Sequence, residues 1–231
     1  MGALPNLPGG RWLVLVGGGV DSAVILGLLA SAGLEFELLH FDYGQKTRQR
    51  ERACVEALCR RYRRTAPITA RIPLLSELSG HDMLEAGAEL GTAEPKRAYV
   101  PFRNTLFLAH AAAWAEHFGF DRIALGSHAS DRICPDNTPQ YIDAAQLLLR
   151  TAQLSSMPIH VEAPLLRMTK TEVVLAGQRI AVPFEQTWSC YNNAELACGT
   201  CGNCRDRLIA FAGAGLTDPI RYREGVCRSA S

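Results

Sequence analysis

The sequence lacks an excess of charge of either sign. Its 231 residues include 24 lysines and arginines against 23 aspartates and glutamates, which leaves a formal net charge of +1. A protein that holds nucleic acid mainly by releasing counterions needs a strongly basic surface. The even balance therefore argues against an obligate nucleic-acid partner and against an anionic membrane surface as a partner.

The sequence also lacks long apolar runs and internal repeats. No stretch approaches the roughly 20 apolar residues of a membrane-spanning helix, and residues 1–11 have neither the basic start nor the apolar core of a secretory signal. We therefore expect a cytoplasmic protein with no membrane partner. The absence of repeats excludes a solenoid, and 48% apolar residues in a chain of this length can form a sizeable core.

Two common phosphate-binding motifs are missing as well, Gly-x-x-x-x-Gly-Lys-Ser/Thr and Gly-x-Gly-x-x-Gly. The first predicted strand is followed instead by Gly17-Gly18-Gly19-Val20-Asp21-Ser22 and then by an apolar helix. Backbone N–H groups of such a loop can surround an anion, and the helix N-terminus adds partial positive charge. We expect Asp21 or Ser22 to cap that helix. The alternative is that the three glycines only make a tight turn.

Short apolar segments alternate with amphipathic segments of helical length along the chain. This alternation predicts an α/β fold with a doubly wound, mostly parallel sheet and helices on both faces. The predicted strands are 12–16, 37–41, 70–72, 122–125 and 159–161, and the predicted helices are 22–32, 46–61, 105–118, 139–149, 169–179 and 205–212. Residues 74–101 predict a long excursion that could act as a mobile lid, and residues 221–231 predict a frayed tail.

The spacing of half of the cysteines predicts a metal site. Four of the eight follow the pattern C-x7-C-x2-C-x2-C, and they are Cys190, Cys198, Cys201 and Cys204. Each C-x2-C step can place two thiolates on one ion, and four thiolates complete a tetrahedral structural zinc site. Iron–sulfur ligation is the alternative, because thiolates suit both.

The other four cysteines do not share this spacing. Cys54 and Cys59 fall on a predicted helix, where we expect core or partly exposed thiols rather than ligands. Cys134 and Cys227 are isolated, and no role is assigned to them.

The glycine loop resembles the Ser-Gly-Gly-x-Asp-Ser loop of the ATP-pyrophosphatase superfamily. Gly17 stands where that superfamily has serine, so we expect pyrophosphate binding to be weakened rather than abolished. Further blocks are similar to the 7-cyano-7-deazaguanine synthase family, and the similarity runs from about Val14 to Pro219. These blocks are Phe41-Asp42-Tyr43-Gly44-Gln45, the segment 99–108, Pro164-Leu165-Leu166 with Lys170 and Glu172, and Thr187-Trp188-Ser189-Cys190-Tyr191-Asn192 before the cysteine cluster.

The resemblance implies an adenine nucleotide alpha hydrolase-like fold and an ATP-dependent carbon–nitrogen ligase. In the family's reaction, ATP activates the carboxylate of 7-carboxy-7-deazaguanine as an acyl-adenylate, ammonia gives the amide, and a second activation gives the nitrile, a queuosine precursor. The implied cofactors are ATP, Mg²⁺ bridging its phosphates, and Zn²⁺ on the four cysteines. An ATP-pyrophosphatase domain is expected over residues 11–185, with a zinc-binding segment and C-terminal helix over residues 186–220.

The resemblance also assigns site residues. The implied catalytic residues are Asp21, Ser22, Arg103 and Lys170. The implied ATP-binding residues are Val16, Gly17, Gly18, Gly19, Val20, Asp21, Ser22 and Asn104. From their chemistry alone, Arg103 and Asn104 could simply begin a helix, and Lys170 with Glu172 could lie on a solvated face.

Several positions depart from the family pattern. They are Gly17, Phe102 at a position that is usually small, His128 where the family tends to have asparagine, and the altered segment 131–141. One alternative is therefore a related deazaguanine enzyme that stops at the amide or conjugates the acyl group to another amine, such as that of a protein substrate. A tRNA thiolase and a non-catalytic nucleotide-binding zinc module are further alternatives, and a homodimer is left open.

Overall fold

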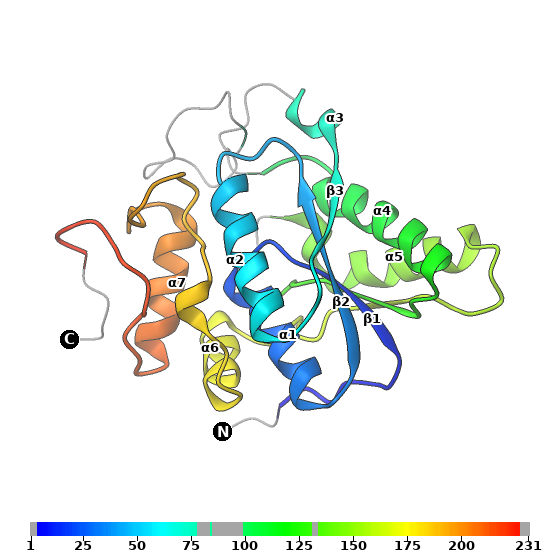
Figure 1. Cartoon of the computed structure of the whole chain (residues 1–231), viewed down its shortest axis with the longest axis horizontal. Coiled ribbons are helices and arrows are strands. Elements are labelled where there is room, and N and C mark those ends of the chain that lie inside the picture. The colour runs from blue at the N-terminus through cyan, green and yellow to red at the C-terminus, as the bar shows by residue number, and fades with distance from the viewer. Residues whose placement is uncertain (1–3, 78–83, 85–98, 131–133, 227–231) are drawn as a thin grey trace.

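The computed structural model describes residues 4–77, 84, 99–130 and 134–226, and these residues form an α/β fold around one parallel sheet (Figure 1). The sheet has five strands in the order β3-β2-β1-β4-β5. The strands are β1 (Arg11–Leu15), β2 (Glu35–Asp42), β3 (Ile68–Arg71), β4 (Arg122–Ala124) and β5 (His160–Glu162). From β1 the chain adds two strands on one side and then two on the other. The predicted doubly wound sheet is thereby confirmed.

The helices also lie where the sequence predicted them, to within a few residues at each end. They are α1 (Val20–Ser31), α2 (Arg48–Arg61), α4 (Arg103–Phe118), α5 (Pro139–Ala152), α6 (Lys170–Arg179) and α7 (Gly202–Gly213), with short helices α3 (Pro73–Ser76), η2 (Pro135–Asn137) and η3 (Phe184–Gln186). The sequence did not predict α3, because Pro73 starts it at the edge of a stretch with little periodicity.

Each face of the sheet carries its own apolar core. Successive strand residues point to opposite faces, so Trp12 and Val14 of β1 join the core under α1, α2, α6 and α7. Leu13 joins the opposite core, which α4 and α5 cover. Helix α7 contributes Ala210 and Phe211 to the first core, and α6 packs against both α1 and α7 (Figure 1). The segment that carries the predicted metal ligands is thus packed on the main domain.

The C-terminal region differs from the expectation. Residues 221–223, predicted as the start of a frayed tail, pair with the segment before α7. Ala197 N–H donates to the Arg221 carbonyl and Arg223 N–H donates to the Ala197 carbonyl, both at 3.0 Å. The prediction was wrong here because these backbone groups find partners in a loop far away in sequence. Most of the predicted excursion 74–101, with its interpretation as a lid, lies outside the described residues.

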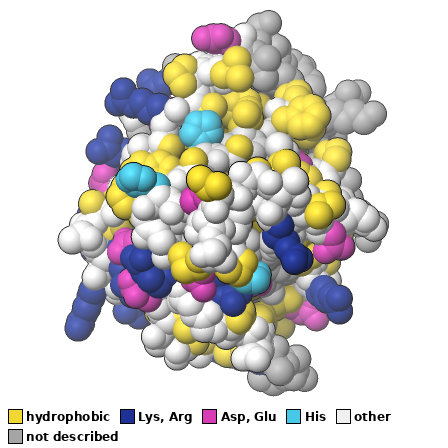
Figure 2. All heavy atoms as spheres, turned by 90° about the vertical axis from the view of Figure 1, so that its right-hand side faces the viewer, with side chains coloured by type: hydrophobic (Ala, Val, Ile, Leu, Met, Phe, Trp, Pro, Cys, Tyr) yellow, Lys and Arg dark blue, Asp and Glu magenta, His cyan; other side chains and the backbone are white. Residues whose placement is uncertain are grey.

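The surface over α4 and α5 mixes apolar and charged side chains (Figure 2). Leu147 and Leu148 of α5 expose 67% and 55% of their surface, and Leu154 in the following loop exposes 96%. Among the described helices, none combines the length and the apolar character that a membrane span requires.

Candidate functional site

The glycine loop lies between the end of β1 and the start of α1. Val16 N–H still donates to the Leu39 carbonyl at 2.9 Å, and the loop then turns sharply at Gly18, whose φ is +72°. A Cβ atom at Gly18 would lie 2.8 Å from Cys54 Cβ and 2.9 Å from the Glu51 carbonyl oxygen. Only glycine therefore fits between the loop and α2 at this position.

The expected capping of α1 by Asp21 or Ser22 is wrong. The N-cap is Gly19, and no side chain caps the helix. Asp21 and Ser22 lie inside the first turn, too late in the sequence to reach the first N–H groups, and Ser22 Oγ donates to the Gly19 carbonyl at 3.2 Å. The first N–H groups of α1 are consequently not occupied by a capping side chain, which is the arrangement that binds anions at helix N-termini.

Asp21 pairs instead with Lys170, a residue 149 positions later in the sequence. Lys170 Nζ lies 2.5 Å from Asp21 Oδ2 and 3.4 Å from His128 Nε2, and His128 Nε2 lies 4.0 Å from Asp21 Oδ1. Only 17% of the Lys170 side chain and 22% of the Asp21 side chain are exposed. This ion pair is sheltered from solvent, so the interpretation of Lys170 as part of a solvated face is wrong.

The start of α6 sets the direction of Lys170. Thr169 and Glu172 form a capping box, and Lys170 N–H donates to Ser130 Oγ at 3.1 Å. The hydrogen bond from the Thr169 backbone N–H holds the pKa of Glu172 below its usual range. Glu172 is exposed and acts as a cap, while the helix it stabilises directs the neighbouring lysine toward the loop.

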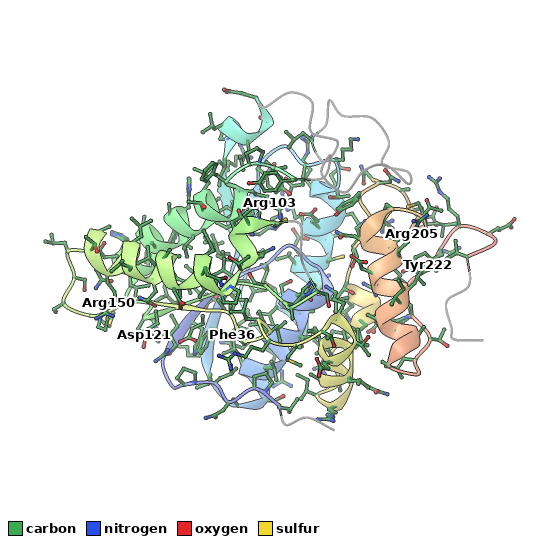
Figure 3. The ribbon with its side chains drawn as sticks, turned by 180° about the vertical axis from the view of Figure 1, so that it is seen from behind. Phe36, Arg103, Asp121, Arg150, Arg205 and Tyr222 are labelled. Carbon is green, nitrogen blue, oxygen red and sulfur yellow. The ribbon has the colours of Figure 1, made fainter. Side chains whose placement is uncertain are left out.

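Arg103 and Asn104 begin α4 (Figure 3), as the alternative interpretation held, yet they also face the site. Arg103 hydrogen-bonds to Tyr43, and burial raises the pKa of Tyr43 to about 12 although Arg103 opposes this shift. The Asn104 side chain donates to Asn137 Oδ1 at 2.9 Å, and its backbone N–H donates to Asp136 Oδ2 at 3.0 Å. Tyr43 and this amide network orient the start of α4.

The residue before Arg103 has a backbone conformation that is uncommon for a side chain of its size. Phe102 has φ +54° and ψ +19°, in the left-handed region, and 69% of its surface is exposed. A bulky residue in this region is strained. The strain lies next to Arg103, at a position where the sequence already departs from the family pattern.

A cavity of about 700 Å³ opens where these elements meet. It lies at the carboxyl ends of β1 and β4, between which the strand order reverses, and open α/β sheets bind their ligands at this place. Every predicted site residue outside the cysteine cluster lines it except Gly18, and the lining residues are Val16, Gly17, Gly19, Val20, Asp21, Ser22, Arg103, Asn104 and Lys170. Loop N–H groups and two cations therefore face one space.

Other lining residues received no role from the sequence. Tyr43 and Trp188 lie in blocks that carried the family resemblance, so a signal was present for them. His40 lies in the buried stretch of β2, and its Nδ1 lies 2.9 Å from the Val16 carbonyl oxygen. Asp206 on α7 lines the cavity because of tertiary packing alone. Cys134 lines the cavity and is half-buried, and no catalytic role is assigned to it.

The four predicted metal ligands come together beside the cavity. Their sulfur atoms all lie within 4.8 Å of one another and all four residues are buried, a donor set and spacing that can hold a metal ion. Cys190 also lines the cavity, so the cluster adjoins the site. Cys54 is half-buried and Cys59 is buried in the first core, as expected for thiols that are not ligands. Cys227 lies outside the described residues.

Comparison with known proteins identifies the family. The family model described as "Queuosine biosynthesis protein QueC" matches residues 11–215. The chain belongs to the QueC family. A 7-cyano-7-deazaguanine synthase from Chlorobaculum tepidum is 35% identical over 218 residues, covering 92% of this chain and 96% of that protein. One from Methanospirillum hungatei is 37% identical over 216 residues, covering 90% and 98%.

QueC family membership confirms the resemblance of the sequence motifs to the 7-cyano-7-deazaguanine synthase family. Among solved structures, NMN synthetase from Francisella tularensis is 17% identical with a TM-score of 0.46, covering 76% of this chain and 63% of that one. The strand order and the two apolar cores by themselves define the α/β fold. The glycine loop, the Asp21–Lys170 pair and the cysteine cluster all lie within the residues that the family model matches.

Proposed function

We propose that this chain uses ATP to convert 7-carboxy-7-deazaguanine and ammonia into 7-cyano-7-deazaguanine, through an acyl-adenylate and an amide. The observation that carries the proposal is the single cavity that the glycine loop, the Asp21–Lys170 pair and Arg103 share. QueC family membership supports the choice of substrate. Pyrophosphate leaves in each activation, and preorganised donors facing that anion are the form of catalysis such a reaction needs.

We assign the residues by their chemistry. The N–H groups of Gly17 and Gly19 and the first turn of α1 would hold the phosphates of ATP, while Gly18 supplies the turn between them. Lys170 and Arg103 would hold phosphate or carboxylate oxygens, for which a sheltered ammonium and a guanidinium are suited. Both cations are already oriented, by Asp21 and Tyr43 respectively, so little reorganisation is required when charge develops.

The donor set suits the two implied metal ions. Asp21 Oδ1 is buried and has no hydrogen-bond partner among the described residues, and a carboxylate oxygen of this kind is a ligand that Mg²⁺ prefers. When bound, Mg²⁺ would neutralise phosphate charge. The four buried thiols fit Zn²⁺ in a closed structural site. We propose Zn²⁺ rather than an iron–sulfur cluster, because the described residues around the four cysteines include no group suited to redox chemistry.

Product analysis tests the function directly. Incubation with ATP, ammonia and 7-carboxy-7-deazaguanine is expected to yield the nitrile with about two AMP per product, because the acid and then the amide are activated. Mass spectrometry of the deazaguanine species together with AMP quantification measures both. One AMP per amide or per amine conjugate would instead support the related enzyme suggested by Gly17 and Phe102. Absence of AMP above background with this acid would reject both.

The departure at Gly17 gives a second test. A Cβ at Gly17 would meet no atom within 4 Å, and its φ is outside the positive region. Gly17→Ser is therefore expected to fold normally and to lower the KM for ATP about threefold to tenfold, because a hydroxyl donor to a charged oxygen is restored. Steady-state kinetics and thermal unfolding measure this.

Gly18→Ser is the matched control for that substitution. It places the same side chain against Cys54 and the Glu51 carbonyl in a strained backbone conformation. We expect the Gly18 variant to lose both stability and activity. An unchanged or raised KM for ATP in Gly17→Ser would contradict the proposed role of this position.

We propose a cytoplasmic enzyme whose partners are the small-molecule substrates, with the zinc-binding segment 186–220 as an appendage of the ATP-binding domain 11–185. A homodimer stays a prediction that gel filtration with light scattering would test.

A further inference from the structure

A short segment between the two sites touches the glycine loop through its backbone. Trp188 N–H donates to the Gly18 carbonyl at 2.9 Å, and the Trp188 carbonyl oxygen would lie 3.7 Å from a Cβ on Gly19. Trp188 and Ser189 line the cavity, and the cysteine cluster begins with the next residue, Cys190. The conformation of this segment therefore affects which way the loop presents its N–H groups.

A fully buried arginine that does not line the cavity holds the segment in place. Arg207 of α7 is 1% exposed and its partner Asp218 is 0% exposed. Two of its nitrogens bind the carboxylate, Nε to Oδ2 at 2.7 Å and Nη2 to Oδ1 at 2.9 Å. The third nitrogen, Nη1, donates to Thr187 Oγ1 at 2.7 Å. Nη1 also lies 3.4 Å from Ser189 Oγ, a longer contact than the one to Thr187. Arg207 does not line the cavity, so it can affect ligand binding only through the residues that it holds.

The surroundings of Arg207 leave it little freedom. Nη2 also donates to the Phe184 carbonyl at 3.1 Å, and Thr187 Oγ1 donates to the same carbonyl at 2.7 Å. Tyr222, which lies alongside α7 (Figure 3), donates its hydroxyl to Asp218 Oδ2 at 2.7 Å. A guanidinium fixed at all three nitrogens defines the place of the hydroxyl that it binds.

We propose that Thr187 and Arg207 are positioning residues for ATP. Arg207 fixes the Thr187 hydroxyl, the adjoining Trp188 backbone is thereby fixed, and its N–H holds the Gly18 carbonyl so that the neighbouring loop N–H groups face the phosphates. This inference rests on the proposed function, since it takes ATP as the ligand of the loop. It links the packing of α7, whose N-terminal end carries Cys204, to the affinity of a loop near the start of the chain.

The decisive variant is Thr187→Val, which has the same shape as threonine but accepts no hydrogen bond from Arg207. The KM for ATP is expected to rise about tenfold, while the KM for the deazaguanine acid changes less than about twofold. Thr187→Ser keeps the hydroxyl and is expected to restore a KM for ATP within about twofold of the unmodified protein. If Thr187 had a purely structural role, Thr187→Val would lower the thermal stability and would not raise the KM for ATP more than the KM for the deazaguanine acid.

A matched control uses a second sheltered arginine–carboxylate pair. Arg122 and Glu162 join β4 to β5, and neither lines the cavity. Arg122→Lys is expected to leave the KM for ATP unchanged. Arg207→Lys removes the donor to Thr187 instead of the acceptor, and it is expected to raise the KM for ATP as Thr187→Val does. If that variant fails to fold, Thr187→Val decides alone, because its hydrophobic replacement preserves the ion pair.

Calorimetric titration of ATP separates this inference from the proposed function. Weaker ATP binding in Thr187→Val, with recovery in Thr187→Ser, supports the positioning role whatever product the enzyme forms. ATP binding by Thr187→Val equal to that of the unmodified protein would overturn the inference and leave the function standing. Equal loss in the valine and serine variants, or equal rises in both KM values, would also overturn it.

Discussion

Replacing Asp21 with asparagine is expected to slow the acid-dependent release of AMP by about a hundredfold or more, with the fold retained. The substitution keeps the shape of the side chain and removes only its charge. One carboxylate oxygen of Asp21, Oδ2, lies 2.5 Å from Lys170 Nζ. The other, Oδ1, is buried and has no hydrogen-bond partner among the described residues. A neutral amide neither binds Mg²⁺ as well nor holds the lysine in place.

Quench-flow or steady-state measurement of AMP checks this expectation, with circular dichroism and thermal unfolding as checks of the fold. Asp143→Asn is the matched control, because it makes the same chemical change at an exposed position of α5. The control is expected to keep full activity. Turnover in Asp21→Asn within about threefold of the unmodified protein would remove Asp21 from the catalytic machinery.

Replacing Cys201 with serine is expected to abolish stoichiometric metal binding and to lower the thermal midpoint by about 10 °C or more. Cys201 is fully buried among the other three thiols, and a structural metal site contributes its binding free energy to folding. The loss of stability is expected to be largest in the segment from residue 187 to residue 223. Its contacts with the Gly18 loop should weaken as well, so ATP affinity is expected to fall together with the metal content.

Elemental analysis of the purified protein measures the first part, and about one zinc per chain is expected in the unmodified protein. Hydrogen exchange over residues 187–223 measures the local unfolding. Cys59→Ser is the control, because Cys59 is a buried thiol of the first core and not a member of the cluster. The control should keep its metal. Well-folded protein that contains neither zinc nor iron would show that the cluster is not a metal site.

The amino-acid sequence by itself determined the features that contiguous residues encode. The glycine loop between strand and helix, the cysteine spacing and the alternation of apolar segments each depend on a few neighbouring positions, and the structure has each of them where the pattern predicted it. The period-2 alternation of β1 already divides Trp12 from Leu13, and these residues do enter opposite cores. Local geometry needs no knowledge of the strand order.

Only the tertiary structure decided which distant residues meet. The patterns predicted a parallel sheet but not the order β3-β2-β1-β4-β5, and this order brings the residues after β1 beside those after β4. Lys170 reaches Asp21 across 149 positions, so its interpretation as a solvated lysine could not be tested locally. Arg207 finds Asp218 and Thr187 in the same way. Such contacts depend on how helices pack on the finished sheet, and propensity and spacing do not contain that information.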